Sequence, residues 1–178
     1  MLRAQVAGHE GPFDALNDVI IARGDVLRVI EIETRIDGVL LSTYRGDGVV
    51  LATATGSTGY ALALGGPVLD PASDDIFLKP IAAHMSQFGG VVVRPPSAFD
   101  LKLISVSPAV VSADGFMNTR LHDGQSVRVT LSPFRAKFLR RQLPAYFWAS
   151  LSRRLGMRQG ALPRRPRSNV DSDTMDAP

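Results

Sequence analysis

The sequence predicts a mainly β fold: a two-layer, sandwich-like domain with short helices and one C-terminal helix. Short apolar or alternating runs recur along residues 5–131, and turn signals separate them about every eight to twelve residues. Between these runs there are no helices of the kind that a doubly wound parallel sheet requires. A chain of 178 residues with 45% hydrophobic content can bury one good core.

The first half of the chain is expected to form strands in a regular series. Residues 5–7 are a candidate first strand, and residues 15–21 resemble one strand with two polar residues within it. Residues 26–36 alternate and carry charge, as a half-exposed strand does, before the Asp37-Gly38 hairpin signal and a partner strand at 39–44. Further strands are expected at 49–55, 90–94, 101–105, 110–113 and 126–131.

Residues 44–67, YRGDGVVLATATGSTGYALALGGP, hold the most informative stretch. A strand runs into Gly56-Ser57-Thr58, and a short helix-compatible segment follows at residues 59–64. Such a corner presents backbone N–H groups beside hydroxyls, which suits a polar ligand edge such as an adenine ring or a ribose. The alternative is that Ser57 or Thr58 only caps the helix.

The period changes near the C-terminus. Phe134, Phe138 and Leu139 fit a short amphipathic turn. Apolar residues at four-residue spacing, beginning at Phe147, then predict a helix that ends at Gly156 and packs its apolar face on the domain. We therefore expect a β domain over residues 1–158 and a disordered Pro-, Arg- and Asp-rich tail over residues 159–178.

Composition and charge exclude several classes of protein. The absence of cysteine excludes disulfides and thiolate metal sites, and no apolar run reaches the length of a membrane span. A cytoplasmic protein without a membrane partner is expected. Residues 135–167 contain ten basic residues and no acidic one. Because such a block is more often a solvated helix face or a basic tail, that interpretation is favoured over a nucleic-acid site.

The residues by themselves assign no catalytic group. His9, His84 and His122 lie too far apart for metal-ligand spacing, so we expect no metal site built from them. The chain has no phosphate-binding P-loop, and Ser57 does not stand in a nucleophile-elbow motif. The pattern alone predicts a β-rich domain with a small polar-ligand corner.

Several motifs, in one order, resemble the C-terminal domain of the NAD kinase family. Residues 46–71, GDGVVLATATGSTGYALALGGPVLDP, resemble the family's DG…STPTGSTAY…AGGP…HP signature. Leu16-Asn17-Asp18 resembles its Leu-Asn-Glu/Asp motif, and residues 111–115, VSADG, its VSxDG motif. Residues 78–84 resemble its LTPICPH segment, and residues 138–156 its closing phenylalanine-rich helix.

The resemblance implies ATP-dependent (or polyphosphate-dependent), Mg²⁺-requiring phosphorylation of the 2′-hydroxyl of the adenosine ribose of NAD, giving NADP. It also implies a homo-oligomer with sites shared between subunits. Thr55, Thr58 and the backbone at Gly59 would hold the adenine edge, and Tyr60 would lie against a nucleoside. Asn17 and Asp18 would hold ribose hydroxyls or the phosphate bridge, and Asp47 would contact polar groups of the ligand, as NAD-binding residues carried over from the family. Structural alternatives are that Asn17 and Asp47 form turns and that Tyr60 belongs to the core.

The departures from the family pattern concern catalysis. The family's Gly-Gly-Asp-Gly loop, whose aspartate is taken as the catalytic base, lies in an N-terminal domain that these 178 residues do not contain. Gly59 stands where the family usually has alanine, and Ala54 where it has proline. Three hypotheses remain: an NAD kinase represented by its C-terminal part, with the kinase domain on a separate or preceding segment; an inactive NAD(P)-binding module; and an oligomerisation domain without a ligand.

Overall fold

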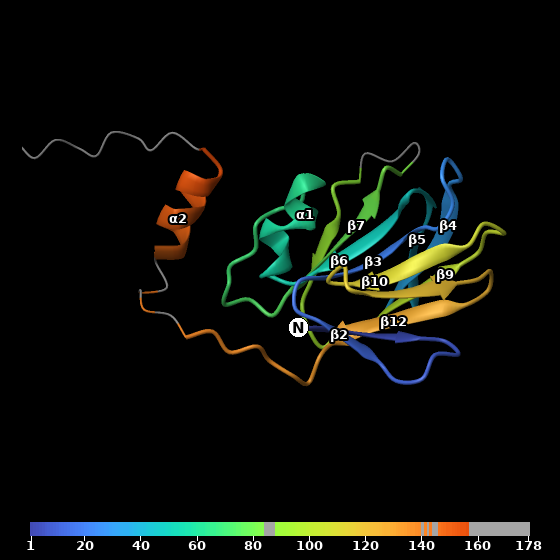
Figure 1. The fold of residues 1–178 in the computed structure, drawn as a ribbon, viewed down its shortest axis with the longest axis horizontal. Coiled ribbons are helices and arrows are strands. Elements are labelled where there is room, and N and C mark those ends of the chain that lie inside the picture. The colour runs from blue at the N-terminus through green and yellow to red at the C-terminus, as the bar shows by residue number, and fades with distance from the viewer. Residues whose placement is uncertain (84–87, 140, 142, 144–145, 157–178) are drawn as a thin grey trace, which may run out of the picture. The chain divides into compact units, whose positions relative to one another are not determined.

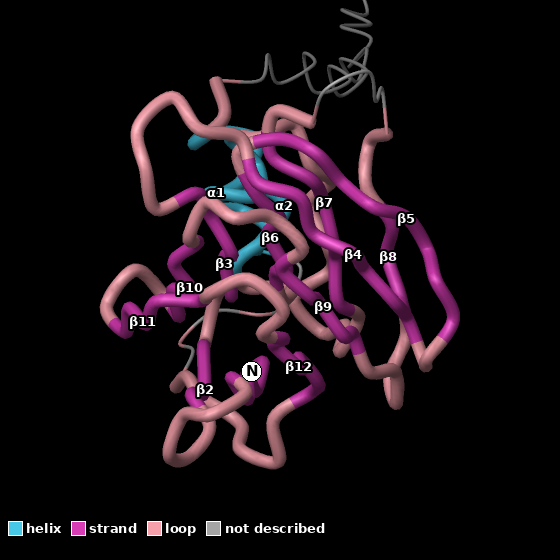
Figure 2. Tube along the Cα trace, turned by 90° about the vertical axis from the view of Figure 1, so that its right-hand side faces the viewer, coloured by secondary structure: helices cyan, strands magenta, loops and turns pink. Residues whose placement is uncertain are grey.

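The computed structural model of the chain describes residues 1–83, 88–139, 141, 143 and 146–156. Residues Met1–Ala136 form one compact unit, and a second unit begins at Lys137. The compact unit consists of two six-stranded antiparallel sheets, whose strands are magenta in Figure 2. The predicted mainly β, two-layer fold is therefore confirmed.

Each sheet combines strands from distant parts of the sequence. The order in the first sheet is β2 (Phe13–Ala15), β1 (Leu2–Val6), β12 (Ser126–Leu131), β9 (Phe99–Leu103), β4 (Ile30–Ile36) and β5 (Val39–Gly46). The order in the second sheet is β11 (Met117–Leu121), β10 (Ala109–Ala113), β3 (Asp18–Arg23), β6 (Gly48–Ala52), β7 (Ile76–Ile81) and β8 (Val91–Val93). Figure 1 shows β6 in the middle of the second sheet, between β3 and β7.

One continuous cluster of buried side chains joins the two sheets. On β4 and β9 every second side chain is buried at the start of the strand, as expected of strands with one face on a core. Ile32 and Leu101 of the first sheet belong to the same cluster as Val49 and Leu78 of the second. The apolar faces of the two sheets therefore pack against each other as a β-sandwich.

Short helices cover one end of β6. The 3₁₀-helix η1 (Gly56–Thr58) and helix α1 (Tyr60–Ala63) follow β6 directly, and α1 lies beside that end of the sheet in Figure 1. A second buried cluster packs Ala61 of α1 against Ala52 and Phe77 of the sheet. All five residues of β6 are buried, because both of its faces are covered. The turn after β6 is thereby fixed on a rigid strand.

The predicted single strand over residues 15–21 is wrong. β2 ends at Ala15 in the first sheet and β3 begins at Asp18 in the second, so Leu16 and Asn17 carry the chain from one sheet to the other. The cause is a contact that is distant in sequence: the Asp114 carboxylate accepts the N–H groups of Leu16 and Asn17 at 2.6 and 2.7 Å. These two amides therefore do not join the hydrogen-bond ladder of a straight strand.

Other boundaries also differ from the prediction. The strand expected at 26–36 begins only at Ile30, because Leu27 adopts a left-handed backbone conformation (φ 62°). The strand expected at 49–55 ends at Ala52, where Thr53 starts a turn. The Asp37-Gly38 hairpin is confirmed, with φ values of 50° and 81° that match a type I′ turn.

Strands β7 and β11 were not predicted. Pro80 argues against a central strand, since proline cannot donate to a sheet ladder. In the structure β8 pairs only with Ile76–Leu78 of β7, so Pro80 lies beyond the end of β8, on the side where no N–H is needed. β11 carries polar residues that hide its alternation, and it pairs only with β10, at the edge of the sheet.

The C-terminal helix is confirmed as α2 (Tyr146–Arg154), and Gly156 follows it with φ 62°. The short amphipathic turn expected around Phe134, Phe138 and Leu139 is wrong, since residues 134–139 form no regular element. The predicted packing of α2 on the domain stays a prediction, and the predicted disordered tail lies outside the described residues. Among those described, no helix has the length and apolarity to span a membrane.

Thr34 on β4 is a polar residue in the core. Its side chain is fully buried, and its Oγ1 atom makes no hydrogen bond within the described part of the chain. Replacing it with the isosteric valine (Thr34→Val) should raise the free energy of unfolding by about 1 kcal/mol, because an unpaired buried hydroxyl is removed. Urea unfolding measures the change. The exposed Thr43→Val on β5 is the matched control and should shift the midpoint little; equal shifts would contradict the argument.

Candidate functional site

Three segments that carry motifs meet at one end of the second sheet. β3, β6 and β10 are antiparallel neighbours, so the start of β3 lies beside the end of β6 (Asp18 opposite Ala52) and the end of β10 (Val19 opposite Ala113). The loop at residues 16–17, the turn at 53–59 and the turn at 114–115 therefore converge. This convergence, called the corner below, is the candidate site.

Asp18 is the electrostatically most unusual residue of the corner. It is 8% exposed, and within the described residues its carboxylate has no hydrogen-bond or ion-pair partner. Burial, and to a lesser degree the negative charge of Asp114, raises the pKa of Asp18 above that of an ordinary aspartate. Among the described residues the Asp18 oxygens are not fully enclosed. A mostly buried carboxylate that no protein group donates to is poorly solvated and still reachable, so Asp18 is placed to accept hydrogen bonds from a ligand.

Ser57 and Thr58 do not cap the helix, so that alternative is wrong: the N-cap of α1 is Gly59, and no side chain bonds to the helix start. Ser57 is fully buried, and its hydroxyl donates to the Ala54 carbonyl at 2.6 Å. The same hydroxyl accepts the Leu69 N–H at 3.0 Å. Ser57 therefore ties the turn to the chain after α1 and is not a free nucleophile.

The residues expected at the adenine edge, Thr55, Thr58 and Gly59, lie along the exposed rim of the corner, as does Tyr60, which is expected against a nucleoside. Tyr60 is 45% exposed, which excludes it from the core. The Gly59 N–H already donates to the Gly56 carbonyl at 2.8 Å, and the Gly59 carbonyl accepts the Leu62 N–H at 3.1 Å. A ligand at the Gly59 backbone would therefore have to share or replace these bonds.

Asp47 lies away from the corner. It stands between β5 and β6, where the chain passes from the first sheet to the second, and its carboxylate pairs with Arg23 at 2.9 Å. The five residues of β6 separate Asp47 from Thr53, so six residue steps lie between them, a length of roughly 20 Å. Within one chain the fold brings Asn17, Asp18, Thr55, Thr58, Gly59 and Tyr60 to one end of the sheet and Asp47 to the other.

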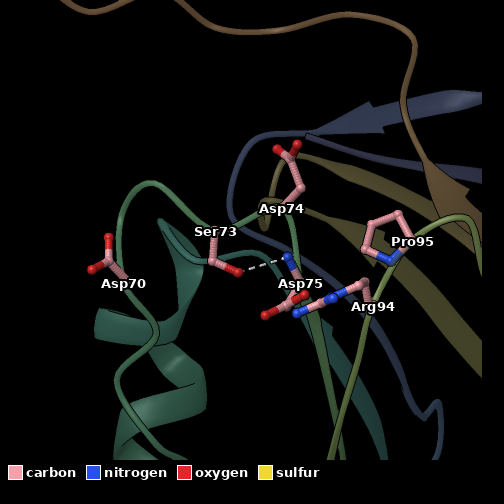
Figure 3. Close-up of a pocket in the computed structure, with 6 residues that line it drawn as sticks. All are labelled: Asp70, Ser73, Asp74, Asp75, Arg94 and Pro95. Carbon is pink, nitrogen blue, oxygen red and sulfur yellow. Dashed lines mark hydrogen bonds between the residues drawn. The ribbon is translucent and has the colours of Figure 1, made fainter.

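A separate hollow of about 530 Å³ lies where β7 begins and β8 ends (Figure 3). Its lining residues are Asp70, Ser73, Asp74, Asp75, Arg94 and Pro95. The Ser73 hydroxyl accepts the Asp75 N–H at 2.9 Å, and Arg135 pairs with Asp74 at 2.7 Å. None of the residues expected in the site lines this hollow. Its excess of carboxylates makes it unsuited to the phosphate bridge of a dinucleotide.

Asp114 is the residue of the corner that the sequence did not single out as functional. It was expected only in a turn of the VSADG segment, yet its carboxylate contacts the loop that carries Asn17 and Asp18. Its left-handed backbone conformation (φ 51°) is one that aspartate adopts more readily than most residues. A contact between residues nearly a hundred positions apart leaves no signal in local sequence.

The chain is similar to known proteins of one family. The family model described as the ATP-NAD kinase C-terminal domain matches residues 16–141. The chain is 38% identical over 159 residues to an NAD kinase of Dehalococcoides mccartyi, covering 87% of this chain and 56% of the relative. It is 41% identical over 145 residues to an NAD kinase of Chloroflexus aggregans, covering 82% and 52% of the two chains. It thus spans about half the length of the curated relatives it matches.

Two solved structures share the fold. An Archaeoglobus fulgidus NAD kinase in complex with ATP aligns with a TM-score of 0.73 at 28% identity, covering 86% of this chain and 59% of that one. Yeast NADH kinase complexed with NADH aligns with a TM-score of 0.68 at 28% identity, covering 72% and 39%. Both likenesses extend over most of the chain described above.

Proposed function

Since this chain belongs to the ATP-NAD kinase family through its C-terminal domain, we propose that it is the NAD-binding part of an NAD kinase. The activity of that kinase is the phosphorylation of the 2′-hydroxyl of the adenosine ribose of NAD by ATP or polyphosphate, giving NADP. The corner at the start of β3 and the end of β6 is the proposed dinucleotide site.

The observation that carries this proposal is the mostly buried Asp18 carboxylate, to which no group in the described part of the chain donates. Ribose hydroxyls are donors that suit a carboxylate, and hydrogen bonds to a charged acceptor are stronger than those between neutral groups. Asn17, beside it in the loop, can both donate and accept. On the rim, Thr55 and Thr58 offer hydroxyls to an adenine edge, and the exposed ring of Tyr60 offers a face to a nucleoside.

The chemistry of phosphoryl transfer requires groups that these residues do not provide. Transfer from ATP needs a base for the accepting hydroxyl and a cradle for the phosphates. The 178 residues contain neither a Gly-Gly-Asp-Gly loop nor a P-loop. The structure, over the residues it describes, brings no three candidate metal ligands together, so we assign no Mg²⁺ ligand and no step through the metal to this chain. We infer that this chain alone binds but does not phosphorylate.

The assembly and location are parts of the same proposal. We propose one domain over residues 1–158, in a cytoplasmic homo-oligomer. The position of Asp47, at the far end of β6 from the corner, fits a role for this carboxylate in the site of a neighbouring copy. Two backbone hydrogen bonds hold Asp47 in place. The Asp47 N–H donates to the Ile81 carbonyl, and the Asp47 carbonyl accepts the Arg23 N–H, both at 2.9 Å.

Calorimetric titration of the chain with NAD and NADP, run beside a turnover assay with ATP and Mg²⁺, tests the proposal. We expect binding without turnover. Turnover would show that the residues include a base and a phosphate cradle that the structure did not reveal. Absence of binding to either dinucleotide would favour the alternative of an oligomerisation module. Binding of NADP with no activity after an N-terminal domain of an NAD kinase is added would favour an inactive NAD(P)-binding module.

A further inference from the structure

The loop that carries Asn17 and Asp18 makes hydrogen bonds through all of its backbone polar groups. Asp114 accepts the N–H groups of Leu16, Asn17 and Asp18 at 2.6, 2.7 and 3.1 Å. The Thr53 hydroxyl donates to the Leu16 carbonyl at 2.7 Å, and the Thr53 N–H donates to the Asn17 carbonyl at 2.9 Å. The Asp114 N–H donates to the Asp18 carbonyl at 3.0 Å. No backbone group of the loop needs water or a ligand.

We propose that Asp114 is a positioning residue of the dinucleotide site, which fixes the backbone of residues 16–18 so that the side chains of Asn17 and Asp18 are presented to the ligand in one arrangement. This inference rests on the proposed function of the corner. Asp114 contacts the loop backbone and not the ligand. The gain lies in preorganisation, since a loop already ordered in the free protein loses less entropy when a ligand binds.

The bonds from Asp114 are directional and unequal. Oδ1 accepts from both Asn17 and Asp18, and Oδ2 accepts from Leu16 alone. Asparagine at position 114 keeps one carbonyl oxygen and tolerates a left-handed backbone, so it can retain the Oδ1 bonds. Glycine tolerates the same backbone but retains none of the three bonds. The two variants therefore separate the hydrogen bonds of Asp114 from its backbone conformation.

Asp114 also acts on Asp18 through its charge. Burial is the larger cause of the raised pKa of Asp18. Among the described residues, Asp114 is the charged group that adds to this effect. It lies on the turn between β10 and β11, and its negative charge raises the pKa of Asp18 further. Either substitution at position 114 removes this charge and should lower the pKa of Asp18. A residue that only supported the fold would not move the pH dependence of ligand binding.

The test compares the full chain with Asp114→Asn, Asp114→Gly and the control Asp123→Asn, which alters an exposed aspartate of another Asp-Gly turn, between β11 and β12. Amide hydrogen exchange in the ligand-free chain should show lost protection at Leu16, Asn17 and Asp18 in the glycine variant, with the amides of the other strands unchanged. NAD affinity should fall about tenfold or more in that variant and less in the asparagine variant. The control should behave as the unaltered chain in both measurements.

In both variants the pH profile of NAD affinity should move to lower pH. Unchanged exchange at the three amides, or a glycine variant that binds NAD as the unaltered chain does, would overturn the inference. If the unaltered chain does not bind NAD, the proposed function fails by itself. The exchange measurement still decides whether Asp114 fixes the loop.

Discussion

Replacing the Asp18 carboxylate with the neutral isostere (Asp18→Asn) should weaken NAD binding about ten- to a hundredfold and leave the domain as stable as before or more stable. The two effects have one cause. In the free protein the carboxylate is mostly buried, has no donor among the residues that the structure describes and has a raised pKa, so its charge is poorly solvated. In the complex, ribose hydroxyls would supply the donors, and hydrogen bonds to a charged group contribute about 1.5–3 kcal/mol each.

The pH dependence of stability gives this prediction a second readout. Because the folded pKa of Asp18 is raised, the native state binds its proton more tightly than the unfolded state does. Stability from this group is present below the unfolded value of about 3.9 and is lost as the pH rises through the folded value. The advantage of the asparagine variant should therefore be absent at pH 3 and appear toward neutral pH.

Urea unfolding at several pH values, with NAD titration at neutral pH, measures both effects. The exposed Asp123→Asn serves as the control and should change neither quantity. A variant that binds NAD with unchanged affinity would remove Asp18 from the site. A variant that loses stability at neutral pH would show that the carboxylate has a favourable partner in the fold.

Adding one methyl group at Gly56 (Gly56→Ala) should destabilise the domain by about 3 kcal/mol and abolish NAD binding. A Cβ atom there would lie 2.0 Å from the Asn17 carbonyl oxygen and 2.5 Å from its carbonyl carbon. Both are backbone atoms, so no change of rotamer relieves the contact, and either the turn after β6 or the Asn17 loop must move. Movement of that loop would displace the side chains of Asn17 and Asp18.

The matched control is Gly89→Ala, since a Cβ atom at Gly89 would meet nothing within 4 Å. This control should change the free energy of unfolding by less than about 0.5 kcal/mol. Thermal or urea unfolding of both variants, with NAD titration, checks the prediction. A Gly56→Ala chain that is as stable as the control and binds NAD would mean that the turn and the loop are not packed as the structure shows.

Local sequence was sufficient for much of the fold and for the family. Alternation, turn signals and the Asp37-Gly38 pair predicted the sandwich and its hairpin, because these features depend on neighbouring residues. The C-terminal helix followed from apolar residues at four-residue spacing and from Gly156, a glycine that can end a helix. Several motifs in one order predicted that the chain belongs to the NAD kinase family, and the comparisons confirm this.

Only the tertiary structure decided how the candidate site is built. It divided the expected strand at residues 15–21 between two sheets and made Asp114 the acceptor for the backbone N–H groups at that crossing. It also left Asp18 mostly buried, with no donor to its carboxylate in the described part of the chain. Each of these results depends on contacts that close long loops, and such contacts are set by sheet order and burial, which the residues near Asp18 in sequence do not encode.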